Sequence, residues 1–264
     1  SPYYVGMQEF IETLLKEAGD MAKAYFYKGV THKTKSNLAD LLTEADLAVS
    51  DFLVRKIHEA YPDDHIHSEE MEKDINPGSF REWVIDPIDG TLNFAKGIPS
   101  WCHLLAVVED KETLYGAAYH PIAQEFFFGE KNHGATMNRM PIRVSQKDSF
   151  DFAIGHGARF PTEDAVYGTH IEQFKEYFRR LNLNTNVWIQ HHGSMIGACY
   201  VASGGLDFFL QNAGLDHDYL APALLCEEAG AVVTDSEGNP WKRGRQDIVI
   251  ANPTLHKKLM ALFA

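Results

Sequence analysis

The residues of this chain that are best suited to chemistry lie in segment 83–94, WVIDPIDGTLNF. An apolar run ends at Asp86, Pro87 fixes the backbone directly after it, and Asp89 follows across a turn. Both carboxylates can therefore converge on one hard divalent cation or on a pair of them. An isolated D-x-x-D is usually a solvated acid pair, but here Pro, Gly and Thr occupy the positions that a metal and phosphate site needs.

Gly90 and Thr91 follow the second aspartate and predict a place for phosphate. Gly90 has no side chain, so the backbone can approach a ligand closely there. The N–H groups near Gly90 and Thr91 open a short helix, and N–H groups at a helix start favour anions. The same segment thus predicts metal ligands beside a phosphate-binding turn.

The charge of the chain restricts its partners. Its 264 residues include 24 Lys and Arg against 37 Asp and Glu, a formal net charge of −13. This charge repels nucleic acid backbones and anionic lipids, so neither direct nucleic acid binding nor membrane binding is expected. It also repels phosphorylated metabolites, unless bound cations reverse the field locally. No apolar run reaches ~18 residues, no secretory signal is visible, and three widely spaced cysteines predict reduced thiols in a cytoplasmic protein.

The first half of the chain predicts two helices followed by strands. Apolar residues recur every three or four positions between Phe10 and Tyr25, which is typical of one face of a long helix. Thr43 can cap a second helix that stops at Pro62 and whose apolar face carries Leu47, Leu53, Ile57 and Tyr61. Five strand-like segments follow and are expected to pair as antiparallel hairpins: 65–67, 83–86, 103–108, 114–120 and 125–129.

After residue 145, strands and helices alternate, which predicts layered α/β packing where the first half is α+β. We expect one sub-domain over residues 1–147, carrying Glu69 and the DPIDGT motif, and a second over residues 148–264, carrying Asp218 and the substrate pocket. The elements expected in the second part are strands at 152–156, 187–190, 206–210, 231–234 and 248–251, and helices around 171–181, 195–202 and 219–228 and from Asn252 onward.

Several of these segments resemble the signatures of the inositol monophosphatase family. Residues 86–94 match its D-P-I-D-G-T-x-N-F signature at every defined position. Asp218 stands about ten residues before E-A-G, as in the second signature. Three further segments are similar to other family elements: Glu69 with Glu70, residues 204–207, and the N-terminal group Lys35, Ser36, Asp40, Thr43 and Asp46.

The resemblance implies a magnesium-dependent, lithium-sensitive phosphatase with the layered αβαβα sandwich of inositol monophosphatases and fructose bisphosphatases. It assigns metal binding to Glu69, Asp86, Asp89, Asp218 and the Ile88 carbonyl. Those oxygen ligands suit Mg²⁺, which keeps several waters and is completed by substrate phosphate. Two or three Mg²⁺ ions are implied, with Mn²⁺ as a substitute and Li⁺ and Ca²⁺ as inhibitors. The family is typically dimeric, so we expect a homodimer.

The catalytic roles implied by the resemblance fall on Thr91, Asp46 and Glu69, while Gly90 and Thr91 hold the phosphate. A hydroxyl that is hydrogen-bonded to a carboxylate can orient a water molecule. The implied reaction is in-line attack by water polarised by one metal and Thr91, with a second metal stabilising the leaving alkoxide and no covalent intermediate. Asp46 has an alternative role, because it could instead complete a capping arrangement with Thr43.

Three positions depart from the family pattern, in addition to Ala231, which replaces the last glycine of the second signature. Ser68 stands where a glycine usually precedes the acidic pair, and His217 stands where Trp usually precedes the second-signature aspartate. Pro222 replaces a small residue and is tolerable only within the first turn of its helix. None of the three changes removes a predicted metal ligand.

The histidines give weaker signals. His65 and His67 alternate along one strand and raise the hypothesis of a zinc site, but no third ligand has a suitable spacing. We therefore expect structural or exposed roles for them, and equally for the pair His191 and His192 and for His217.

The predicted substrate-binding residues are Asp89, Ser194, Gln211 and Asp218. Gln211 stands where inositol phosphatases carry a glutamate that contacts substrate hydroxyls, and Ser194 lies near a small-residue element that lines the same pocket. Glutamine both donates and accepts hydrogen bonds, so a polyol such as inositol monophosphate is the expected substrate. Histidinol phosphate, a sugar bisphosphate and 3′-phosphoadenosine 5′-phosphate stay open as alternatives. A different class of function, an accessory protein-interaction module in transcription complexes, also stays open.

Overall fold

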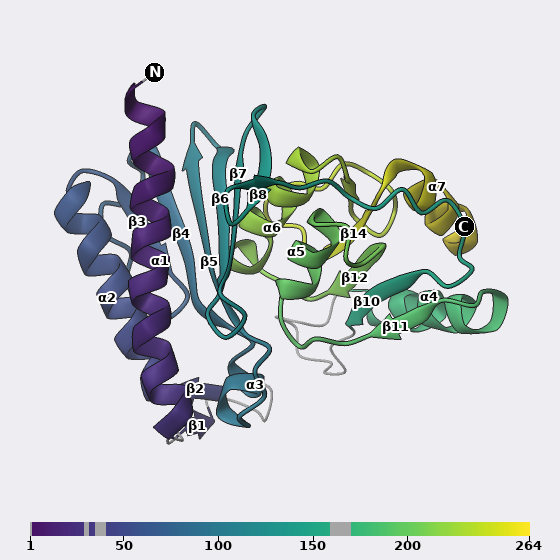
Figure 1. The fold of residues 1–264 in the computed structure, drawn as a ribbon, viewed down its shortest axis with the longest axis horizontal. Coiled ribbons are helices and arrows are strands. Elements are labelled where there is room, and N and C mark those ends of the chain that lie inside the picture. The colour runs from purple at the N-terminus through teal and green to yellow at the C-terminus, as the bar shows by residue number, and fades with distance from the viewer. Residues whose placement is uncertain (1, 29–31, 35–40, 159–169) are drawn as a thin grey trace.

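The computed structural model describes residues 2–28, 32–34, 41–158 and 170–264. Helical layers alternate with two sheets across the molecule (Figure 1). In order, the layers are α1 (Pro2–Lys28) with α2 (Glu44–Ala60), a seven-stranded sheet, α5 (Ile196–Ala202) with α6 (Asp216–Glu228), a five-stranded sheet, and α4 (Ile171–Asn184) with α7 (Pro253–Phe263). This arrangement confirms the predicted αβαβα sandwich.

The seven-stranded sheet contains all five strands predicted in the first half. Its strand order follows the sequence: β3 (His65–Ser68), β4 (Arg81–Asp89), β5 (Cys102–Glu109), β6 (Glu112–His120), β7 (Glu125–Glu130), β8 (Gly134–Met137) and β9 (Met140–Pro141). Neighbours pair antiparallel except β3 and β4, which are parallel. The short strands β8 and β9 were not predicted, and β1 (His32–Thr34) and β2 (Leu41–Thr43) form a separate two-stranded sheet.

The five-stranded sheet is mixed. Its order is β11 (Trp188–Gln190), β10 (Ile154–Ala158), β12 (Phe208–Asn212), β14 (Asp247–Ala251) and β13 (Val232–Thr234). The first three strands run parallel, and β14 is antiparallel to both of its neighbours. The predicted division between residues 147 and 148 stays a prediction. Helix α6, from the second half of the chain, packs against the seven-stranded sheet of the first half.

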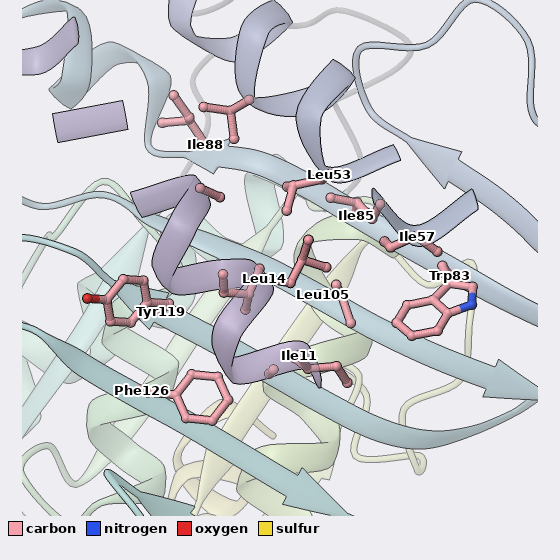
Figure 2. Packing of buried hydrophobic residues seen from close by; sticks show 14 of the residues in the cluster. Ile11, Leu14, Leu53, Ile57, Trp83, Ile85, Ile88, Leu105, Tyr119 and Phe126 are labelled. Carbon is pink, nitrogen blue, oxygen red and sulfur yellow. The ribbon is translucent and has the colours of Figure 1, made fainter. Parts of the chain in front are cut away.

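A continuous apolar core joins α1 and α2 to the large sheet (Figure 2). The three-and-four spacing predicted for α1 places Leu14 and Ala18 against this sheet, where they are buried, and Ile11, outside the predicted set, is buried beside them. Helix α2 contributes Leu53, but Leu47 is 47% exposed, so its predicted place on the apolar face was wrong. The periodicity of α2 is carried by Ala45, Val49, Leu53 and Ile57 instead.

Helix α6 lies directly on the opposite face of this sheet, which fixes the position of its N-terminal end. A Cβ added to Gly116 of β6 would lie 2.7 Å from the carbonyl oxygen of Ala221, so glycine permits this close approach. Pro222 stands in the interior of the helix, beyond the first turn, and the predicted restriction to that turn was wrong. A proline there removes the N–H that would bond to the carbonyl of Asp218 and leaves that carbonyl without its helical donor.

None of the helices in the described part of the chain is both long and apolar enough to cross a membrane.

Candidate metal and phosphate site

Strand β4 carries two of the predicted metal ligands past an irregularity. Asp86 pairs with Leu104 of β5 and Asp89 pairs with Cys102, so β4 has one extra residue between them. A bulge of this kind reverses the alternation of side chains along a strand. Trp83, Ile85 and Ile88 accordingly join the core under α1 and α2, and both aspartates face the other side. The strand thus continues to Asp89, three residues beyond its predicted end.

Pro87 occupies the bulge, where a strand tolerates a residue without an N–H. The imidazole of His103, on the neighbouring strand, donates from Nδ1 to the Pro87 carbonyl. Burial lowers the pKa of His103 to about 4, so the ring is neutral. His103 therefore satisfies a carbonyl that the irregular pairing leaves available. Sequence reasoning missed this residue, and no spacing signal marks it.

Helix α6 supplies the third carboxylate. Asp86, Asp89 and Asp218, here called the aspartate cluster, each place a carboxylate oxygen within 4.8 Å of the others. Asp218 lies in the first turn of α6, where its Oδ2 accepts a 2.6 Å hydrogen bond from the Leu215 N–H. The helix start fixes this side chain by capping, so its second oxygen can face the cluster.

Asp89 is held by three donors. Its Oδ2 accepts hydrogen bonds from the Ser194 hydroxyl, from the Met195 N–H at 2.6 Å and from the Cys102 thiol at 3.4 Å. Ser194 is buried and was predicted to bind substrate, but in this structure its hydroxyl is bonded to Asp89, a predicted metal ligand. Its role toward substrate stays a prediction.

The electrostatics of the cluster favour a cation. Burial raises the pKa of Asp86 well above its ordinary value, and the charges of Glu69 and Asp89 raise it further. Burial also raises the pKa of Asp89 to about 7, with a contribution from the Asp218 charge, although the Ser194 and Met195 hydrogen bonds oppose the rise. Carboxylates gathered in this way repel one another until a proton or a cation neutralises them.

The residues present fit a hard divalent cation. Asp86 is only 2% exposed, and its Oδ1 has no hydrogen-bond partner among the described residues. An orphaned buried carboxylate oxygen is costly unless an ion or water satisfies it. Three carboxylates and a backbone carbonyl offer only oxygen, the ligand that Mg²⁺ prefers. Two or three ions and the Glu69 ligand assignment stay predictions.

Thr91 and Gly90 stand at the start of the short helix α3 (Thr91–Ala95), directly after the aspartates. The Thr91 hydroxyl donates a 3.1 Å hydrogen bond to the Ile88 carbonyl, the predicted metal-binding carbonyl. Gly90 has a φ of +91°, and a Cβ there would meet the backbone of Ser100 and Gly193, which explains the glycine. The predicted phosphate-binding role of Gly90 and Thr91 stays a prediction.

The remaining predicted residues lie at different distances from the cluster. Asp46 is buried in α2 and adds to the rise of the Asp86 pKa, so its charge faces the site. Gln211 on β12 hydrogen-bonds to the hydroxyl of Tyr219, the residue that follows Asp218. The Ser68 hydroxyl is hydrogen-bonded to the Ser50 hydroxyl at 2.8 Å, which satisfies this polar group in its buried position. Lys35, Ser36 and Asp40 lie outside the described residues, as does the side chain of Thr43.

Histidines flank the cluster on the side of Glu69. His217 Nε2 lies 3.7 Å from Asp218 Oδ2 and 3.9 Å from Glu69 Oε1. The His67 ring stacks on His217 with a centroid distance of 6.4 Å, and its Nδ1 is 2.9 Å from Asp74 Oδ1. Asp74 also contacts His65 at 2.7 Å. The sequence indicated His217 only as a departure from a pattern, and the fold places it between two predicted metal ligands.

Comparison with known proteins gives consistent relationships over the whole chain. The profile of the inositol monophosphatase family matches residues 6–264. A fructose-1,6-bisphosphatase/inositol-1-monophosphatase of Thermotoga maritima is 28% identical over 252 residues, covering 96% of this chain and 93% of the relative. The Nus factor SuhB of Pasteurella multocida is 28% identical over 253 residues, covering 93% of this chain and 91% of the relative.

The fold is also shared with solved structures. An inositol monophosphatase (IMPase) from Thermotoga maritima superimposes with a TM-score of 0.87 at 27% identity, covering 98% of this chain and 96% of that one. The agreement extends over both sheets and every helical layer, since almost the full length of each chain is aligned.

Proposed function

The chain belongs to the inositol monophosphatase family, and on that premise we propose that it is a Mg²⁺-dependent phosphomonoesterase acting on a small phosphorylated metabolite. The observation that carries the proposal is the aspartate cluster together with the orphaned Oδ1 of Asp86. When bound there, Mg²⁺ would supply a Lewis acid that polarises water and neutralises phosphate charge. Asp86, Asp89, Asp218 and the Ile88 carbonyl would hold it, together with Glu69.

The chain's own residues orient the reacting groups. The proton of the Thr91 hydroxyl is committed to the Ile88 carbonyl, so the lone pairs on Oγ1 are left to accept a hydrogen bond from water. A water held in this way presents its own lone pair to the phosphorus in line with the leaving oxygen. The N–H groups near Gly90 and Thr91 hold the phosphate, and Asp46 adds negative charge that helps retain the proton released by the water.

Inositol monophosphate is the first substrate to test. Gln211 is buried and hydrogen-bonded to Tyr219, and its amide has further donor and acceptor positions for the hydroxyl groups of a polyol. The Thermotoga relative carries both bisphosphatase and monophosphatase in its name, so a sugar bisphosphate is an equal candidate for the panel. Histidinol phosphate and 3′-phosphoadenosine 5′-phosphate complete the set.

The test is phosphate release from this panel with and without Mg²⁺, compared by kcat/KM. We expect no hydrolysis without an added divalent cation, hydrolysis with Mg²⁺ or with Mn²⁺ in its place, and inhibition by Li⁺ and Ca²⁺. Failure to hydrolyse every ester in the presence of Mg²⁺ would contradict the proposal.

A second candidate function rests on the similarity to Nus factor SuhB. The acidic surface, with a net charge of −13, disfavours direct RNA contact and suits a basic protein partner. Recovery of transcription proteins by the tagged chain from lysate supports this role, and their absence counts against it. We also expect a cytoplasmic homodimer, which sedimentation of the purified protein tests.

A further inference from the structure

His217 is the one imidazole that the described structure places against two predicted metal ligands from separate elements. Its Nε2 is 3.7 Å from Asp218 Oδ2 on α6 and 3.9 Å from Glu69 Oε1, which follows β3. Its side chain is 11% exposed, so the ring is largely shielded from solvent. Two atoms bound to one ion at about 2.1 Å lie about 3 to 4 Å apart, so the distance from Nε2 to either carboxylate oxygen allows that pair to share an ion.

The ring of His217 is held in place by its neighbours. His67 stacks on it with an interplanar angle of 26°, and His67 is in turn fixed by its 2.9 Å contact with Asp74. The helix start behind His217 is anchored by Asp216, which accepts a 2.6 Å bond from Arg243 Nε, and Arg243 also binds Glu82 of β4. A side chain held from both sides in this way is preorganised for a ligand.

We propose that His217 is a nitrogen ligand on the Glu69 and Asp218 side of the metal site, and that it shifts the selectivity of this site from Mg²⁺ towards Mn²⁺ and Zn²⁺. The inference rests on the proposed function, because it concerns the cations of the same site. Imidazole suits first-row transition metals, whereas Mg²⁺ prefers an all-oxygen shell and gains little from nitrogen. The tryptophan usual in the family at this position offers no ligand atom of this kind.

The alternative is that His217 stays in an outer shell, hydrogen-bonded to the two carboxylates. Both arrangements place the same ring beside the same oxygens, so activity measurements do not separate them. Direct coordination is distinguished by the magnetic coupling between the ¹⁴N nucleus of the imidazole and the unpaired electrons of Mn²⁺. The probe is therefore Mn²⁺ itself, added to the purified full-length chain.

The experiment is pulsed electron paramagnetic resonance of the Mn²⁺-loaded protein, together with calorimetric titration by Mn²⁺ and by Mg²⁺. We expect ¹⁴N modulation in the wild type and its loss in His217→Gln and His217→Trp. The ratio of Mn²⁺ to Mg²⁺ affinity should fall by ~10-fold or more in both variants, since loss of ligand support weakens metal sites by such factors. His133→Gln is the control, because it removes an exposed imidazole that has no contact with His217, so the modulation should persist.

The outcomes separate this inference from the proposed function. Mn²⁺ binding without ¹⁴N modulation in the wild type overturns the inference, and so does modulation that survives in His217→Gln. Asp89→Asn tests the site itself, since it should weaken binding of both cations. If Asp89→Asn bound Mn²⁺ and Mg²⁺ as the wild type does, the proposed metal site would be wrong as well.

Discussion

Asp86 and Asp89 present their carboxylates on the same side of β4, although residues three apart in a regular strand point to opposite faces. The extra residue between them, accommodated around Pro87, reverses the alternation and turns Asp89 towards α6. Asp218 then completes the cluster from the start of that helix. The site therefore depends on the register between β4 and β5 as much as on the motif.

Asp89→Asn should reduce Mg²⁺-dependent phosphate release by at least ~10²-fold, because the side chain keeps its shape and loses the charge that holds the cation. The measurement is kcat/KM at saturating Mg²⁺ on the best ester of the panel. Asp20→Asn, an equal change at a largely exposed site on α1, is the control and should leave the rate unaltered. Full activity in Asp89→Asn would show that this carboxylate is not a metal ligand.

Ser194→Ala should weaken Mg²⁺ binding by ~10-fold, because the hydroxyl is a hydrogen-bond donor to Asp89, a proposed metal ligand. The Mg²⁺ concentration for half-maximal rate should rise for every ester, while KM at saturating Mg²⁺ stays the same. Ser203→Ala, which removes a hydroxyl bonded to the Tyr200 carbonyl, is the control. A rise in KM confined to one ester would instead support the predicted substrate-binding role.

His103→Phe should lower both thermal stability and Mg²⁺ affinity, because the buried Pro87 carbonyl loses its donor at a cost of ~1–3 kcal/mol. His103→Asn should recover part of both, since its amide N–H lies near the position of Nδ1. Thermal unfolding without and with Mg²⁺ measures the stability of each variant and its affinity for Mg²⁺. Unchanged Mg²⁺ affinity in His103→Phe would mean that the bulge holds without this bond.

Because His156 is buried in its neutral form, we expect the free energy of unfolding to fall in acid. Burial lowers the pKa of His156 from 6.5 to about 3, and its Nδ1 accepts a hydrogen bond from the His192 N–H. The unfolded chain therefore takes up a proton that the folded chain refuses, and the stability present above pH 6.5 is lost as the pH falls towards 3. Between pH 8 and pH 5 the loss is about 2 kcal/mol.

The variant His156→Phe keeps an aromatic ring against Phe209 and removes the titrating group. Its free energy of unfolding, measured in urea, should change by about 2 kcal/mol less than that of the wild type between pH 8 and pH 5. His133→Gln, at an exposed imidazole, is the control. An equal pH dependence in His156→Phe and wild type would contradict this account.

Gly116→Ala should displace α6 and destabilise the protein by ~1–3 kcal/mol, because the new Cβ would lie 2.7 Å from the Ala221 carbonyl. Asp218 lies one turn earlier on the same helix, so Mg²⁺ affinity should fall as well. Gly6→Ala in α1 is the matched control, since a Cβ there meets nothing within 4 Å. That change should stabilise the helix by ~0.5–1 kcal/mol, and urea unfolding compares the two variants.

The sequence alone predicted most of the helices and strands in their order, and the segment that carries two aspartates of the cluster. Both are local properties: the spacing of apolar residues sets the period of α1, and Pro87, Gly90 and Thr91 constrain the backbone around the aspartates. The rules that use only local sequence gave errors at positions whose surroundings are set by other elements. Leu47 was placed on the apolar face of α2, and Pro222 was confined to the first helical turn, whereas neighbouring elements decide both positions.

The tertiary structure decided which side chains meet. The bulge in β4 exists only as a register against β5, and the approach of α6 depends on Gly116. Three further contacts join separate segments of the chain: His103 with the Pro87 carbonyl, Ser194 with Asp89, and His217 with Glu69. Spacing along a sequence carries no information on distances between separate elements, because packing and strand pairing set them. For that reason the motif was predictable from the sequence, and the environment that raises the pKa values of its aspartates was not.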